Sequence, residues 1–150
     1  MTSSDVIRCL RSYYKEKGYM CFEELRLGTG NKGNSKQRMD FYAIDPWPSH
    51  RYHGVGFEIK VSIADFRAEL RNPKKREAAQ KLCSQFFFCA PTGLLDVDDI
   101  PADSGFVTVN PFLSNIIFNR QAPLYKPKAT WNFLASVMRR CERYNERKHT

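Results

Sequence analysis

The sequence lacks the features of several large protein classes. No apolar run approaches the roughly 20 residues that a membrane-spanning helix needs, and the polar residues 1–5 have neither region of a signal peptide. The five cysteines are odd in number, scattered and free of any Cys-x-x-Cys pair, which argues against a disulfide framework and against structural zinc. We therefore expect a soluble, cytoplasmic protein with reduced cysteines and no membrane partner.

Common catalytic motifs are absent as well. The chain has no Gly-Lys-Ser/Thr phosphate-binding loop and no Gly-x-Ser-x-Gly elbow, which argues against nucleotide hydrolysis and serine esterase chemistry. The acidic run 96–99 lacks the glycine and the glutamate that complete a calcium loop, so we interpret it as a turn.

Positive charge is in excess. The formal net charge is +8 and the pI is about 9.4, which suggests a polyanionic partner, here DNA. Basic residues 139–148 fit a solvated helix face and a DNA contact equally well. The residues that we expect to contact DNA are Arg26, Lys32, Lys36, Arg38, Arg67, Arg71, Lys74 and Lys75.

Hydrophobic periodicity predicts one α/β domain over residues 1–150, with a mixed sheet and flanking helices. Helices are expected over 4–17, capped by Ser3 or Ser4, over 63–83 with a break at Asn72-Pro73, and over 129–147. Strands are expected over 19–27, 38–45, 55–61, 86–90, 105–110 and 115–118, and the apolar 86–90 strand follows a helix, which favours a parallel crossover. The last helix is expected to bury Phe133, Leu134, Val137, Met138, Cys141 and Tyr144.

Two carboxylates and one ammonium are expected to meet on neighbouring strands. Alternation places Glu58 and Lys60 on one face of their strand, and a hairpin through the turn-rich residues 46–54 would bring Asp40 beside Glu58. Mg²⁺ or Mn²⁺ could be bound by Asp40, Glu58 and the main-chain carbonyl of Ile59, with water and substrate at the other positions. Lys60 could orient water or offset charge on a phosphate. A buried ion pair is the alternative explanation.

Two further side chains are candidates for this catalytic site. Glu24, on the preceding strand, could bind a second metal or polarise water, although an exposed strand carboxylate is nearly as good an explanation. Gln80 could reach the lysine or the scissile phosphate from the following helix, and a surface glutamine is its simpler interpretation.

The pattern resembles the PD-(D/E)XK nuclease superfamily, and within it the MmcB-like DNA repair family. The resemblance covers about residues 6–144 and rests on Phe22-Glu23-Glu24-Leu25, Arg38-Met39-Asp40, Phe57-Glu58-Ile59-Lys60, Ile63-Ala64-Asp65-Phe66-Arg67 and Phe86-Phe87-Phe88-Cys89-Ala90-Pro91. It implies a restriction-endonuclease-like core and a Mg²⁺- or Mn²⁺-dependent deoxyribonuclease that acts in DNA repair, replication or recombination. The loop before Asp40 is longer than in that family, Val61 replaces a serine, and a tryptophan expected within 70–75 is absent, which is consistent with a distant or phage-encoded member.

Two other functions fit the same residues. One is a DNA-binding repair accessory that keeps the fold without turnover. The other is a Holliday-junction-resolvase-like nuclease, which requires a homodimer. With either function, we expect an intracellular protein associated with the nucleoid.

Overall fold

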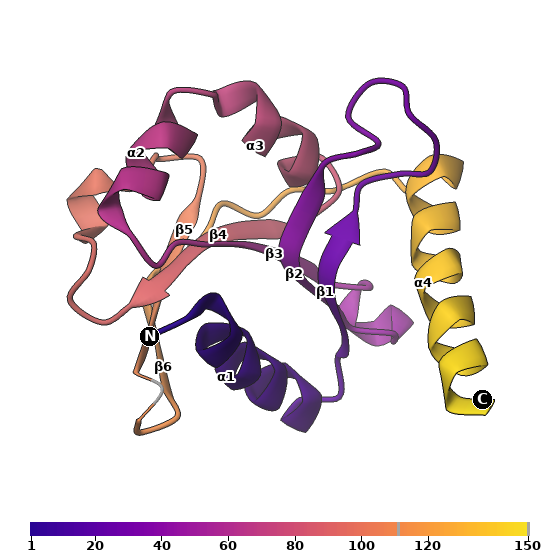
Figure 1. Cartoon of the computed structure of the whole chain (residues 1–150), viewed down its shortest axis with the longest axis horizontal. Coiled ribbons are helices and arrows are strands. Elements are labelled where there is room, and N and C mark those ends of the chain that lie inside the picture. Colours follow the sequence, from indigo (N-terminus) through magenta and orange to yellow (C-terminus); the bar gives the residue numbers. More distant parts are fainter. Residues whose placement is uncertain (111, 150) are drawn as a thin grey trace.

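One mixed sheet organises residues 1–110 and 112–149, which the computed structural model describes (Figure 1). Its six strands follow the chain in sequential order, β1-β2-β3-β4-β5-β6. The strands are β1 (Met20–Arg26), β2 (Arg38–Ile44), β3 (Gly54–Ile59), β4 (Gln85–Pro91), β5 (Gly105–Asn110) and β6 (Asn115–Arg120). The helices are α1 (Ser3–Glu16), α2 (Ile63–Leu70), α3 (Pro73–Gln80) and α4 (Trp131–His149). The expected α/β fold with a central mixed sheet and flanking helices is confirmed.

The strand directions follow from the connections. Short links join β1, β2 and β3 as antiparallel neighbours, whereas the two helices between β3 and β4 return the chain and make that pair parallel. Strand β4 also pairs in parallel with β5, and β6 closes the sheet in the antiparallel direction. Because β4 is central and covered on both faces, Phe87 and Phe88 are almost fully buried, as its apolar sequence predicts.

Helices cover both faces of the sheet. In Figure 1, α1 lies below the sheet, α2 and α3 lie above it, and α4 stands beside β1 at one edge. Leu10 of α1 belongs to the core beneath the sheet with Phe41 and Phe57. Met39 and Phe86 form the opposite core with Phe133 of α4. Asp40 lies on β2 and Glu58 on β3, two strands that these cores hold from both sides.

The first helix begins one residue earlier than expected. Thr2, rather than Ser3 or Ser4, is its N-cap: the Thr2 hydroxyl accepts from the Asp5 N–H, and the Asp5 carboxylate accepts from the Thr2 N–H at 2.9 Å. This reciprocal pair requires an acid three residues after the cap, which only Thr2 has. The Ser62 cap of α2 and the start of α3 at Pro73 are as expected.

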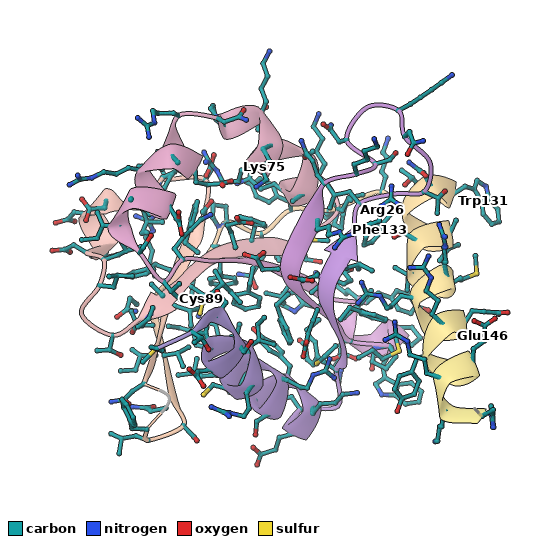
Figure 2. All side chains as sticks on the ribbon, viewed as in Figure 1. Arg26, Lys75, Cys89, Trp131, Phe133 and Glu146 are labelled. Carbon is teal, nitrogen blue, oxygen red and sulfur yellow. The ribbon has the colours of Figure 1, made fainter. Side chains whose placement is uncertain are left out.

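The buried stripe predicted for α4 is largely wrong. Phe133 is buried and Val137 is half-buried, but Leu134, Met138 and Tyr144 are 42%, 52% and 65% exposed, and Cys141 is also exposed. Figure 2 shows Phe133 pointing toward the sheet and Trp131 pointing away from it. The reason is that α4 packs mainly on one edge strand, β1, so only a narrow line of the helix meets the protein.

Polar bonds complete the contact between α4 and β1. The Ser136 hydroxyl donates to the Arg26 carbonyl at 2.7 Å, and the Arg140 guanidinium donates to the carbonyls of Glu23 and Glu24. Helix α4 is therefore held to the sheet edge by hydrogen bonds to the strand in addition to apolar packing.

All five cysteines are unpaired, and Cys9, Cys83 and Cys89 are buried, as expected. Within the part of the chain that the structure describes, no helix is both long enough and apolar enough to cross a bilayer.

Candidate active site at the ends of β2 and β3

The Asp40 side chain lies where the pairing of β2 with β3 stops. The two strands pair from Ile44↔Gly54 to Phe41↔Phe57. One residue beyond the last pair on β2, the Asp40 carboxylate Oδ2 accepts a hydrogen bond from the Ile59 N–H at 2.7 Å. The side chain thus takes the position of a strand partner, which places Asp40 beside the Glu58-Ile59-Lys60 segment as the sequence predicts.

Glu58 and Lys60 form a buried ion pair. The Lys60 ammonium Nζ donates to Glu58 Oε1 at 2.9 Å, and their side chains are only 10% and 11% exposed. The strand alternation predicted from sequence accounts for this arrangement, because residues two apart project to the same face.

Glu69 of α2 is a member of the site that the sequence analysis missed. Its Oε2 accepts from Lys60 Nζ at 3.3 Å and lies 3.7 Å from Lys75 Nζ. The buried residues of α2 are Phe66 and Glu69, whereas Ile63 and Leu70 are 44% and 37% exposed. The available signal was spacing: residues three apart share a helix face, so a glutamate three residues after a buried phenylalanine is directed inward.

Burial opposes the full ionisation of the carboxyl groups at this site. Burial raises the pKa of Asp40 despite the Ile59 hydrogen bond and the nearby charge of Lys60. Burial, together with the charge of Asp40, raises the pKa of Glu58 to about 7. Burial alone would lower the pKa of Lys60, but Glu58 and Glu69 outweigh it and the net shift is upward. Lys60 is therefore cationic, and a further positive charge at the site would favour the ionised forms of Asp40 and Glu58.

The free oxygens of the two strand acids fit a hard divalent cation. Among the described residues, Asp40 Oδ1 and Glu58 Oε2 have no hydrogen-bond partner, because each carboxylate uses its other oxygen. No group of three or more His, Cys, Asp or Glu side chains within residues 1–110 and 112–149 could hold a metal ion. A donor set of two carboxylates suits Mg²⁺, which usually binds one or two carboxylates plus water and substrate phosphate, better than it suits zinc.

The structure does not bring Glu24 and Gln80 into this cluster. Glu24 falls opposite Asp40 in the strand register, but its backbone is left-handed, with φ of 47°, and its side chain is 70% exposed and 4.0 Å from Arg38. The Gln80 amide nitrogen instead donates to Ser104 Oγ at 3.2 Å and to the Asp103 carbonyl. Glu24 is therefore turned to solvent, and Gln80 holds the turn before β5.

The residues expected to contact DNA have different roles in the structure. Arg26 donates to the carbonyls of Gly30 and Ser35, so it shapes the loop of residues 28–36. Lys75 is tied to Glu69, and Arg38 is close to Glu24. The remaining members are exposed: Lys32, Lys36, Arg67, Arg71 and Lys74.

Comparison with known proteins adds the fold alone. The chain matches no protein-family model and has no significant sequence match among curated proteins. Its structure is similar to that of a protein of unknown function from Silicibacter pomeroyi, with a TM-score of 0.70 and 18% sequence identity over 100% of this chain and 95% of that chain.

Proposed function

We propose that this protein is a metal-dependent endonuclease that hydrolyses phosphodiester bonds in DNA during repair, replication or recombination. The observation that carries the proposal is the hydrogen bond from the Ile59 N–H to Asp40, which positions one carboxylate against the strand that presents Glu58 and Lys60. Two acids can bind a divalent cation, and one lysine can offset charge on the phosphate, which are two of the tasks in this hydrolysis.

Each residue has a separate task in this proposal. Asp40 and Glu58 would hold Mg²⁺ or Mn²⁺ through their free oxygens, and the Ile59 carbonyl remains the third predicted ligand. Such a cation supplies charge neutralisation at the phosphate and a water of lowered pKa. The Lys60 ammonium holds its proton at neutral pH, so it can donate a hydrogen bond to a phosphate oxygen and offset charge that develops there. Glu69 orients Lys60 from the opposite side.

The order of elements supports the same proposal. A helix, three antiparallel strands, helices and a parallel strand precede β5 in this chain. This is the order that the resemblance to the PD-(D/E)XK superfamily implies, with Asp40 on the second strand and Glu58 and Lys60 at the end of the third.

One observation favours a DNA-binding accessory without turnover. Lys60 is held between Glu58 and Glu69, and a lysine fixed by two buried carboxylates is also what a purely structural ion-pair network contains. Such a protein would bind DNA with strong salt dependence but would not consume it.

A cleavage assay separates the two functions. Linear, nicked, flapped and branched DNA are incubated with the protein and Mg²⁺ or Mn²⁺, and with EDTA as the control. The nuclease proposal expects cation-dependent product on at least one substrate. The absence of product on all four, together with salt-sensitive binding, would contradict it and support the accessory. Mass in solution tests the resolvase-like alternative, which requires a homodimer.

A further inference from the structure

A lysine-lined hollow borders helix α3, the helix that also carries Lys75, the ion-pair partner of Glu69. It has a volume of about 1120 Å³ and lies between α3, the 28–36 loop, the 121–130 segment and the start of α4. Among the described residues, five lysines line it and Glu77 is the one acidic lining residue. The lysines are Lys32, Lys74, Lys81, Lys126 and Lys128, of which the last three were not among the residues expected to contact DNA. We call this feature the lysine hollow.

The charges of the lysine hollow are uncompensated. Among the described residues, none of its five lysines takes part in an ion pair. The basic groove between α1, β1 and α4 differs in that three of its arginines bond within the protein: Arg11 to Glu23, Arg26 to Gly30 and Arg140 to Glu24. Like charges that converge without partners repel one another, so the lysine hollow is complementary to a polyanion.

Specific hydrogen bonds hold the walls of the hollow in place. The Asn132 side chain accepts from the Thr29 N–H at 2.8 Å and donates to Ser35 Oγ at 3.1 Å, which joins the 28–36 loop to α4. Gly28 makes this possible, because a Cβ there would lie 2.2 Å from Asn132 Nδ2.

The 121–130 segment is fixed in the same way. The Tyr125 N–H donates to the Ser84 carbonyl at 2.7 Å, and the Gln85 side chain donates to the Ala122 carbonyl at 2.9 Å. Three segments that are distant in sequence are therefore held around one space before any ligand arrives.

The lining suits unpaired bases as well as phosphates. Apolar side chains of Leu27, Ala78 and Leu82 line the hollow together with the lysines, and Tyr125, which also lines it, is 42% exposed. Single strands present both phosphates and base faces, and they bind where basic residues and aromatic rings occur together. A duplex presents mainly its phosphates, so the apolar lining would have no partner. The volume also exceeds the roughly 300–1,000 Å³ of an ordinary small-ligand pocket.

We infer that the lysine hollow binds a single-stranded segment of nucleic acid next to the cleavage site. Consecutive residues connect the two places, because Lys74 lines the hollow and Lys75 lies 3.7 Å from Glu69. That the strand is DNA, and that it is the strand to be cut, rests on the proposed nuclease function. The preferred substrate is then DNA with an unpaired region.

Binding is tested in EDTA, so that cleavage does not interfere. Fluorescence anisotropy measures the Kd for a labelled oligothymidylate of about 12 nucleotides, the length of a typical single-strand site, and for oligouridylate and duplex DNA of equal length. The wild type is expected to bind oligothymidylate at least about 10-fold more tightly than duplex, with a slope of log K against log salt of about −3 to −4 for five lysines. Equal or tighter binding of duplex would overturn the inference, and a preference for oligouridylate would overturn the identification of the strand as DNA.

Matched variants locate the site. The double substitution Lys126→Ala/Lys128→Ala is expected to weaken oligothymidylate binding about 10-fold and to reduce the salt slope by about 1.4. Lys15→Ala/Lys17→Ala removes the same charge from the end of α1 and is expected to change Kd by less than about 2-fold. Tyr125→Ala is expected to weaken binding about 10-fold with an unchanged slope, because a stacked ring carries no charge. Equal effects of the two lysine pairs, or equal competition by polyglutamate, would overturn the inference.

The inference and the proposed function can fail separately. Lysine-dependent binding of single strands without cleavage in Mg²⁺ or Mn²⁺ contradicts the nuclease alone. Cleavage without such binding contradicts the lysine hollow alone. Circular dichroism of each variant verifies that it is folded.

Discussion

The Asp40 carboxylate accepts a hydrogen bond from the N–H of Ile59 at 2.7 Å, at the residue that separates Glu58 from Lys60. One bond therefore fixes the acid of one strand relative to both functional groups of the next. Because the acceptor is a single oxygen, the other carboxylate oxygen is left for a cation.

Asp40→Asn removes the negative charge at residue 40 and keeps a hydrogen-bond acceptor for the Ile59 N–H. The asparagine carbonyl can still accept from Ile59, so folding should be retained, while loss of the anionic ligand should reduce cleavage by about 100-fold or more. Cleavage rates and thermal melts of the purified variant measure the two effects. Glu24→Gln is the control, because Glu24 lies opposite Asp40 in the register but is exposed, and it should cleave like the wild type. Undiminished activity of Asp40→Asn contradicts the proposed site.

Glu69→Gln tests a positioning residue. Loss of the anion next to Lys60 should lower the pKa of the lysine, so the alkaline limb of the kcat profile should move to lower pH, with kcat reduced by about 10-fold. A residue with only a structural role would lower stability without moving that limb. Glu16→Gln on α1, which is exposed and lies outside both the candidate site and the lysine hollow, serves as the control and should leave the profile unchanged.

The raised pKa of Glu58 makes stability depend on pH. In the folded protein the group binds its proton up to about pH 7, compared with a reference value of 4.5. Between these values the folded state holds more protons than the unfolded state, so the free energy of unfolding without metal should fall as the pH rises from 4.5 to 7. The loss should be on the order of 3 kcal/mol, and Glu58→Gln should remove it. Urea unfolding at several pH values measures this.

Divalent cation should reverse the trend. Because the proposed Mg²⁺ site uses the ionised forms of Asp40 and Glu58, the cation should stabilise the wild type more above pH 7 than at pH 5. Equal stabilisation of wild type and Asp40→Asn at both pH values would place the cation elsewhere.

Glu24 occupies a backbone conformation that favours glycine. With φ of 47°, Glu24→Gly should leave the free energy of unfolding unchanged or raise it by up to about 1 kcal/mol, while Glu24→Val should lower it by about 1–2 kcal/mol. Glu23→Gly, one residue earlier in ordinary strand conformation, should be destabilising. A destabilised Glu24→Gly variant would show that the side chain matters more than the backbone.

The two neighbours Phe133 and Leu134 test the orientation of α4. Phe133 is 9% exposed and Leu134 is 42% exposed, so truncation of the first to alanine should cost about 3 kcal/mol and truncation of the second less than about 0.5 kcal/mol. Chemical denaturation of both variants gives the comparison. Similar losses would mean that the helix buries the wider stripe predicted from its sequence.

Sequence predicts the strands of this protein better than the faces of its helices. The bounds of β5 are as expected. The parallel pairing of β4 was predictable because its apolar sequence requires cover on both faces and a helix precedes it, which is the arrangement of a parallel crossover. The apolar stripe of α4 misleads, because helical periodicity shows that Leu134 and Met138 share a face but not whether a partner covers that face.

The candidate site shows the same contrast between its strand residues and its helix residue. Asp40, Glu58 and Lys60 were predictable, because strand alternation and one hairpin determine their meeting. Glu69 was not predicted, because its inward direction depends on how α2 lies on the sheet. Lys126 and Lys128 join the lysine hollow only because a segment without helix or strand structure is fixed at Ser84 and Gln85.

The bonds between α4 and β1 also bear on assembly between copies. An edge strand with free carbonyls can be extended by the edge of another molecule. Here Ser136 and Arg140 already donate to the carbonyls of Arg26, Glu23 and Glu24, and the helix stands along that edge. Strand addition at β1 is therefore blocked, so sheet-to-sheet association is left to the β6 edge, at the far side of the sheet from α4.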